Sequence, residues 1–174
     1  MCEVGIPNKE ISYVYEKEVL NKINQNVAAI SISQAIFSGD TDKLQKQLDK
    51  FMLESISSYD TANEGFCQGT PSVYHGMMLG LCAVLSNRYR VRSNRESGIG
   101  RFDIMLIPKV KSIPAFIYEF KYTKDEKVNL DELADEALKQ IDEKKYEEEL
   151  IDSDIKKIIK IGIAFRGKSA VVRK

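Results

Sequence analysis

The apolar residues of this chain recur with two different periods, and the change of period divides the sequence. Up to about residue 87 they recur every three to five positions, which predicts amphipathic helices over residues 7–25, 31–39, from 41 onward and 71–87. Beyond that point, short apolar stretches predict strands at 89–93, 101–107 and 115–121, then a long helix, then strands at 155–165 and 169–172. The pattern predicts an α/β protein, one compact domain in which a helical extension, residues 1–60, packs on a core of residues 61–174.

Local signals place the ends of several helices. Ser31 or Ser33 is expected to cap the second helix, Asp40 or Thr41 the third, and Pro71 fits the first turn of the fourth. Asn129 or Asp131 is expected to cap the long helix after the strands. The apolar stripes predicted to be buried are Leu44, Leu48, Phe51 and Ile56, then Val73, Met77, Leu81, Val84 and Leu85, then Leu130, Leu133, Ala134, Ala137, Leu138 and Ile141. On the strand at 101–107, one face is predicted to hold Phe102, Ile104 and Leu106, and the other Asp103, Met105 and Ile107.

Two of the strands carry ionisable residues where a buried strand is normally apolar. Side chains two positions apart share a face, so Glu119 and Lys121 project together, and Asp103 can face them if the two strands pair. Two carboxylates can bind Mg²⁺ or Mn²⁺, and an ammonium beside them can hold an anion, which suits cleavage of a phosphodiester bond. The alternative is an edge-strand ion pair with Asp103 as a capping residue. The cost of desolvating charges beside apolar neighbours favours the metal site.

The glycine-rich turn predicted between the first two strands concentrates charge near Asp103. Arg95 and Arg101 are candidates for holding substrate phosphates, and Glu96 between them is a candidate for a further metal ligand. Glu64, in the preceding loop, is a weaker candidate for the same position. The alternative is that Glu96 only pairs with an arginine and pins the turn.

Three other polar residues are candidates for binding a substrate. His75, the only histidine, lies near the start of the fourth helix, where a hydrogen-bonded structural role is the alternative. Gln140 interrupts the apolar stripe of the long helix, and Tyr146 follows six residues later. Both could overhang the strand ends where a substrate would lie, or they could be polar residues of the helix surface.

Composition limits the class of protein. The chain has 174 residues, of which 43% are hydrophobic and 30% charged, so it can bury a substantial core. No apolar run approaches the roughly eighteen residues of a membrane span, and the N-terminus lacks a secretory pattern, so we expect a cytoplasmic protein without membrane contact. Cys2, Cys67 and Cys82 are odd in number and lack metal-ligand spacing, which argues against a disulfide framework and a zinc site.

Charge is segregated along the chain although the formal net charge is zero. Residues 86–124 contain 9 basic and 3 acidic residues, and residues 155–174 contain 7 basic and none acidic, whereas residues 125–154 contain 4 basic and 13 acidic. Both basic segments are strand-like and would meet in one sheet, which favours a positive surface near the candidate carboxylates. Alternating solvated faces are the other interpretation.

Five motifs carry a resemblance to a known family: Tyr74-His-Gly76, Ser93-Asn-Arg-Glu-Ser-Gly-Ile-Gly-Arg-Phe-Asp103, Glu119-Phe-Lys121, the Gln140 and Tyr146 pair, and Gly162-Ile-Ala-Phe-Arg-Gly-Lys168. In this order they resemble the PD-(D/E)XK nuclease superfamily. The resemblance implies a restriction-endonuclease-like core of a helix, a three-stranded antiparallel meander, a helix and a strand. Over about residues 5–174 the sequence is more similar still to the nuclease-like domain that follows an AAA-type ATPase domain in many bacterial proteins.

The resemblance implies a role for each strand residue. Asp103 and Glu119 would be metal ligands, and Lys121 would polarise the scissile phosphate and the attacking water. The family usually has a further acid just before the Tyr-His pair, where Thr70-Pro-Ser-Val73 stands here, and the ATPase domain is absent. We therefore expect a Mg²⁺- or Mn²⁺-dependent nuclease acting on nucleic acid, DNA in the first place, with an AAA-type ATPase domain as a possible partner and the oligomeric state open. The alternative is a weakly active or inactive module of the same fold that binds nucleic acid or a partner protein.

Overall fold

A computed structural model describes the backbone of residues 27–59, 71–97 and 100–174; the side chains of Val27, residues 54–59, residues 94–97 and Arg101 are outside this description, as is the helix predicted at 7–25. The elements are α2 (Val27–Ser38), α3 (Thr41–Tyr59), α4 (Pro71–Ala83), the 3₁₀-helix η1 (Val84–Asn87), β1 (Tyr89–Ser97), β2 (Gly100–Pro108), β3 (Ala115–Tyr122), α5 (Leu130–Glu143), α6 (Glu148–Asp152), β4 (Ile158–Arg166) and β5 (Ser169–Arg173). This order confirms the predicted α/β class, with a helical part before a restriction-endonuclease-like core.

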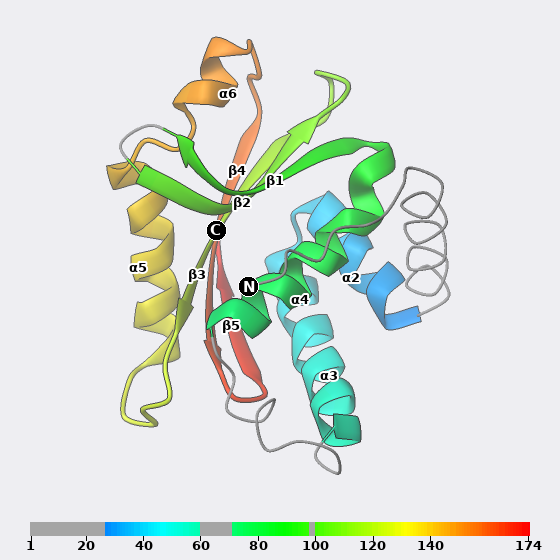
Figure 1. Cartoon of the computed structure of the whole chain (residues 1–174), viewed down its shortest axis with the longest axis vertical. Coiled ribbons are helices and arrows are strands. Elements are labelled where there is room, and N and C mark those ends of the chain that lie inside the picture. The colour runs from blue at the N-terminus through cyan, green and yellow to red at the C-terminus, as the bar shows by residue number, and fades with distance from the viewer. Residues whose placement is uncertain (1–26, 60–70, 98–99) are drawn as a thin grey trace, which may run out of the picture.

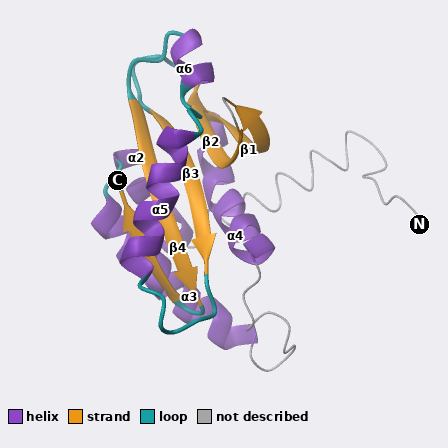
Figure 2. Cartoon of the chain, turned by 90° about the vertical axis from the view of Figure 1, so that its left-hand side faces the viewer, coloured by secondary structure: helices purple, strands orange, loops and turns teal. Residues whose placement is uncertain are grey.

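The five strands form one sheet in the order β1-β2-β3-β4-β5. β1, β2 and β3 are antiparallel neighbours, which confirms the predicted meander. β4 lies parallel to β3, because α5 carries the chain back across the sheet, and β5 returns antiparallel to β4. α5 covers one face of the sheet, while α2, α3 and α4 lie on the other (Figures 1 and 2).

The core has a layer on each face of the sheet. One layer joins side chains of α2, α3 and α4 to strand residues such as Phe116 and Ile163. The other joins Ile117 and Met105 to Ile141 of α5 and to the segment around α6. β3 is therefore buried on both faces from Ala115 to Glu119, which explains its nearly continuous apolar sequence and makes the carboxylate within it exceptional.

Two predicted caps are confirmed and one is wrong. The Asp40 carboxylate accepts from the backbone N–H of Lys43 at 3.0 Å, and the Asn129 side chain accepts from that of Asp131 at 2.9 Å. Ser33 lies inside α2, which begins several residues earlier than predicted. Its hydroxyl donates to the carbonyl of Ala29 at 2.7 Å, so it bonds within the helix and caps nothing.

α4 begins at Pro71 as predicted, and Leu81 and Leu85 of the predicted stripe are buried, but the first half of the stripe is rotated by one residue, to Tyr74 and Met78 in place of Val73 and Met77. The buried residues are Tyr74, Met78, Leu81 and Cys82, followed by Leu85 of η1. The docking of Tyr74 explains the rotation, because its ring stacks on Phe165 at 4.6 Å and its hydroxyl donates to the carbonyl of Gly167 at 2.8 Å. His75, next in sequence, is thereby turned toward β1 and β2.

Two further observations concern the cysteines and the possibility of a membrane span. Cys82 is a free, buried cysteine, and burial raises the pKa of its thiol to about 12, which favours the unreactive protonated form. Cys2 and Cys67 lie outside the described residues. Within the described ranges, no helix combines the length and the apolar character needed to cross a membrane.

Candidate active site where β2 leaves β3

The candidate site lies where the pairing of β2 with β3 ends. The register pairs Leu106 with Phe116, Met105 with Ile117 and Ile104 with Tyr118, and no further pair follows within the described strands. β3 nevertheless continues to Tyr122, paired along its whole length with β4. In the gap that opens, Oδ2 of Asp103 accepts from the backbone N–H of Phe120 at 2.8 Å. A carboxylate thus takes the place of the acceptor that a paired strand would supply.

The same divergence changes the face that Phe102 occupies. Phe102 was predicted to share a face with Ile104, but it lies in the core layer under α5 together with Met105, and Ile104 lies in the layer under α4. Strict alternation holds only while a strand keeps its regular twist, and here it breaks at Asp103 as β2 turns away. The strand β1 also continues to Ser97, so the stretch predicted as a turn is mostly a β-hairpin.

Glu119 and Lys121 share a face, as predicted, and both bond to Gln140 of α5. Nζ of Lys121 donates to Oε1 of Gln140, and Nε2 of Gln140 donates to Oε1 of Glu119. The amide therefore bridges the carboxylate and the ammonium. This neutral bridge holds both side chains in place.

α5 can reach Glu119 because a glycine lies beneath it. Gly162 pairs with Glu119 across β3 and β4. A Cβ at Gly162 would clash with the carbonyl oxygen of Ala134 and would lie 2.7 Å from the backbone nitrogen of Leu138. The missing side chain lets the backbone of α5 approach the sheet closely, which brings Gln140 within hydrogen-bonding distance of the site.

Tyr146 lies behind Gln140, in the interior. Its side chain is only 1% exposed, its ring meets Phe102 edge to face at 6.2 Å, and its hydroxyl accepts from Nε2 of Gln140 at 3.3 Å. Gly100 leaves room for it, since a Cβ there would lie 3.2 Å from the Tyr146 ring and hydroxyl. Gln140 and Tyr146 thus meet at the site, but Tyr146 does so from within.

Burial dominates the electrostatics of the two acids. Desolvation, and then the neighbouring Asp103, raise the pKa of Glu119 to about 8 against the opposing effect of Lys121. Desolvation also raises the pKa of Asp103, although the N–H of Phe120 and the charges of His75 and Lys121 oppose it. Oε2 of Glu119 is buried without a hydrogen-bond partner among the described residues. Burial therefore outweighs the nearby positive charge of Lys121 in setting the pKa values of both acids.

His75 and Ser93 complete the described surroundings of Asp103. Nδ1 of His75 lies 3.6 Å from Oδ1 of Asp103, and Nε2 lies 2.6 Å from Oγ of Ser93. The ring also meets Phe120 edge to face at 6.0 Å. We did not predict a role for Ser93 from the sequence; the available signal was that it begins the motif that ends at Asp103.

The side chains of the remaining predicted site residues lie outside the part of the chain that the structure describes. The register pairs Glu96 with Arg101 and Arg95 with Phe102 in the backbone of the hairpin, while the side chains of the three charged residues lie outside the description, as does Glu64. Among the described residues, no three or more His, Cys, Asp or Glu side chains are grouped so that they could hold a metal ion. Glu96 as a further ligand stays a prediction.

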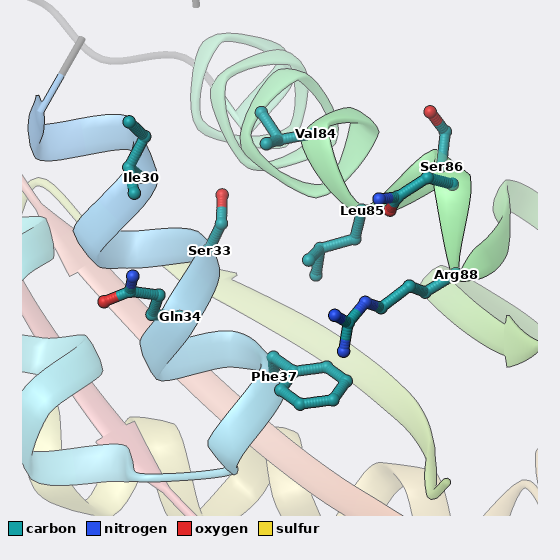
Figure 3. A pocket seen from close by; sticks show the side chains of 9 residues that line it. Ile30, Ser33, Gln34, Phe37, Val84, Leu85, Ser86 and Arg88 are labelled. Atoms are coloured by element: carbon teal, nitrogen blue, oxygen red, sulfur yellow. The ribbon is translucent and has the colours of Figure 1, made fainter. Parts of the chain in front are cut away.

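A described cavity lies elsewhere. It measures about 580 Å³ and lies between α2 and η1 (Figure 3). Its lining includes Ile30, Phe37 and Leu85, and Arg88 lies over the Phe37 ring at 4.8 Å. Its lining contains no carboxylate, so this cavity is separate from the candidate site.

The comparisons with known proteins agree with this geometry. The family model described as the PD-(D/E)XK nuclease superfamily matches residues 71–174. The match begins at α4 and includes the strands that carry Asp103, Glu119 and Lys121. Among curated proteins, no relative matches the sequence. Since the family model covers more than half of the chain, this protein belongs to the PD-(D/E)XK nuclease superfamily.

Proposed function

We propose that this chain is a divalent-metal-dependent nuclease that hydrolyses phosphodiester bonds of nucleic acid, with DNA as the first substrate. Membership of the nuclease superfamily supports the class of reaction. The single observation that carries the proposal is the buried Oε2 of Glu119, which has no hydrogen-bond partner among the described residues and lies beside a second carboxylate, Asp103. A buried acceptor without a partner is costly unless a ligand completes it.

The donor atoms fit a hard cation. Carboxylate oxygens are the ligands that Mg²⁺ and Mn²⁺ prefer, and Asp103 and Glu119 would hold the ion. A bound cation would stabilise the charge that develops on the phosphate and lower the pKa of a bound water. The raised pKa values of both acids agree with this fit, because burial outweighs the opposing charge of Lys121 and a bound cation would favour the ionised carboxylates.

The other side chains of the site hold charge and geometry for the reaction. Lys121 donates to the neutral amide oxygen of Gln140, and its ammonium can stabilise the transferred phosphate. Gln140 occupies one oxygen of Glu119 and leaves the other for a ligand. Tyr146 supports Gln140 from the interior, and His75 lies against Asp103.

The substrate surface extends from this site along β1 and the basic hairpin. Arg90 is exposed, and Arg92 bonds to Glu149 of α6. Arg90 and Arg92, together with Arg95 and Arg101, would supply phosphate contacts that position the nucleic acid without reading its sequence. An AAA-type ATPase domain as a partner rests on the sequence resemblance alone.

The test is a cleavage assay with matched variants. We expect the chain, supplied with Mg²⁺ or Mn²⁺, to cut plasmid or linear DNA in preference to RNA, and EDTA to abolish cutting. Asp103→Asn should abolish both cleavage and calorimetric metal binding while keeping the fold, measured by circular dichroism. Metal affinity that is unchanged in Asp103→Asn would falsify the site.

A binding module without cleavage is the second candidate, and one observation favours it. α4 begins with the exposed residues Pro71 and Ser72, where the related nucleases usually have a further acid, and the described residues offer two carboxylates at the site. Such a module would bind DNA in EDTA with an affinity that falls steeply with salt, and would cut nothing in any metal. Fluorescence anisotropy over a salt series, run beside the cleavage assay, separates the two functions.

A further inference from the structure

Three side chains from three elements form a line that ends at the candidate metal ligand. Ser93 lies on β1, His75 on α4 and Asp103 on β2. The Ser93 hydroxyl lies 2.6 Å from Nε2 of His75, and Nδ1 of His75 lies 3.6 Å from Oδ1 of Asp103. Ser93 is paired with Ile104, whose side chain faces α4, so the register directs Ser93 toward the same helix.

The chemistry of the partners determines where the imidazole proton lies. An ionised carboxylate only accepts hydrogen bonds, so the nitrogen that faces Asp103 is the one that carries the proton. In that tautomer Nε2 presents a lone pair to which the Ser93 hydroxyl, 2.6 Å away, can donate. Rotating the ring by half a turn would put carbon atoms in both positions and lose both interactions.

We infer that Ser93 is a positioning residue: it fixes the orientation and tautomer of His75, and through His75 it orients the carboxylate of Asp103. The catalytic consequence rests on the proposed nuclease function. Asp103 then has one oxygen held by the N–H of Phe120 and the other faced by the N–H of His75, from two different elements. Partners that orient a ligand in this way affect metal binding although they do not touch the metal.

A purely structural role for Ser93 predicts something different. A hydroxyl that only tied β1 to α4 would change the stability of the fold when removed. It would leave the tautomer of His75 and the affinity of the folded chain for Mn²⁺ unchanged. The two roles are therefore separated by the state of one imidazole ring.

That ring can be observed directly, because His75 is the only histidine in the chain. Long-range proton–nitrogen spectra of the metal-free full chain, at about pH 8.5 where imidazole is ordinarily neutral, give one set of ring signals. We expect the wild type to show the tautomer protonated at Nδ1. Ser93→Ala and Asp103→Ala should each shift the ring toward the averaged signals of a free imidazole, and Ser93→Thr, which keeps the hydroxyl, should not. An unchanged ring in Ser93→Ala overturns the inference, as does a wild type protonated at Nε2.

The consequence for the metal is measured by a double-mutant cycle with Mn²⁺ calorimetry. Ser93→Ala should weaken Mn²⁺ binding roughly three- to tenfold, less than the loss expected for a group that bonds a ligand directly. The same substitution should have no further effect in a His75→Ala background. Equal effects in both backgrounds contradict the inference. A wild type that binds no Mn²⁺ contradicts the proposed function, while the ring spectra still decide the role of Ser93.

Discussion

The two edges of β3 are bonded in different ways. Toward β4 the strand is paired from Ala115 to Tyr122, and backbone hydrogen bonds satisfy that edge throughout. Toward β2 the pairing ends at Tyr118, and the Asp103 carboxylate reaches the N–H of Phe120 in place of a backbone carbonyl. The continuous edge builds the sheet, and the interrupted edge leaves a buried position where side-chain chemistry replaces backbone pairing.

The comparison extends to what covers each edge. Over the continuous edge, α5 lies against Gly162 with no room for a side chain. Beside the interrupted edge, Glu119 keeps a buried oxygen without a partner among the described residues. Tight packing on one side fixes Gln140, and Gln140 in turn holds the charged side chains of the other. The predictions below test whether the two edges contribute separately to activity and to stability.

Lys121→Met should have the largest effect. Removing one preorganised charge from a transition state typically costs about 100- to 1000-fold in turnover, so cleavage should fall by this factor while Mn²⁺ affinity stays within a few fold. Lys121→Arg should not restore cleavage, because a planar guanidinium cannot occupy the position of a point charge. Lys124→Met, at an exposed lysine just beyond β3, is the matched control and should cut like the wild type. Normal turnover in Lys121→Met would remove the residue from the mechanism.

Gly162→Ala tests the continuous edge. The added methyl would meet the α5 backbone at Ala134 and Leu138, which cannot move independently of the helix, so we expect a loss of about 3 kcal/mol in the free energy of unfolding. Gly76→Ala is the control, since a Cβ there meets no atom within 4 Å and alanine is the better helix former. Urea unfolding measures both variants. A Gly162→Ala chain as stable as the wild type would mean that α5 is not held by this contact.

Local sequence patterns were sufficient for part of this architecture. The alternation of side chains in β3 placed Glu119 and Lys121 on one face, and the hairpin-length loop before β3 made β2 its neighbour, so Asp103 could be expected nearby. The caps at Asp40 and Asn129 were predictable for the same reason. Each of these features depends on residues close together in the chain.

The predictions were wrong where contacts between distant parts of the chain determine which way a side chain faces. The rotation of α4 is set by the ring of Tyr74 against Phe165, more than ninety residues away, and a helical period alone cannot fix it. The change of face at Phe102 follows from β2 leaving β3, which the two-residue period does not encode. The contact between His75 and Ser93 joins a helix to a strand, so neither sequence pattern pointed to the other.

Glu119→Gln tests the burial of the acid at the interrupted edge. The pKa of Glu119 rises from its ordinary 4.5 to about 8 in the fold, so between these values the folded chain holds a proton that the unfolded chain has released. The stabilisation by the neutral acid is therefore complete below about pH 4.5 and is lost as the pH rises to about 8. Urea unfolding in EDTA should show the wild type losing stability relative to Glu119→Gln across this range. A difference that does not vary with pH would mean that Glu119 is not desolvated.

Tyr146→Phe should have the smallest effect and decides between two roles for this residue. The variant keeps the ring against Phe102 and removes only the hydroxyl, whose hydrogen bond from Gln140 is long at 3.3 Å. The free energy of unfolding should therefore fall by at most about 1 kcal/mol, the contribution of one ordinary hydrogen bond.

If Tyr146 acts through Gln140, as its 1% exposure favours, Tyr146→Phe should lower cleavage about two- to fivefold by loosening the amide that bridges Glu119 and Lys121. The same substitution should then have no further effect in a Gln140→Leu background. If Tyr146 contacts the substrate itself, as the sequence alone suggested, the loss should persist in that background and should appear as a raised KM. Measuring kcat and KM for the four chains of this cycle distinguishes a residue that supports the site from one that binds the nucleic acid.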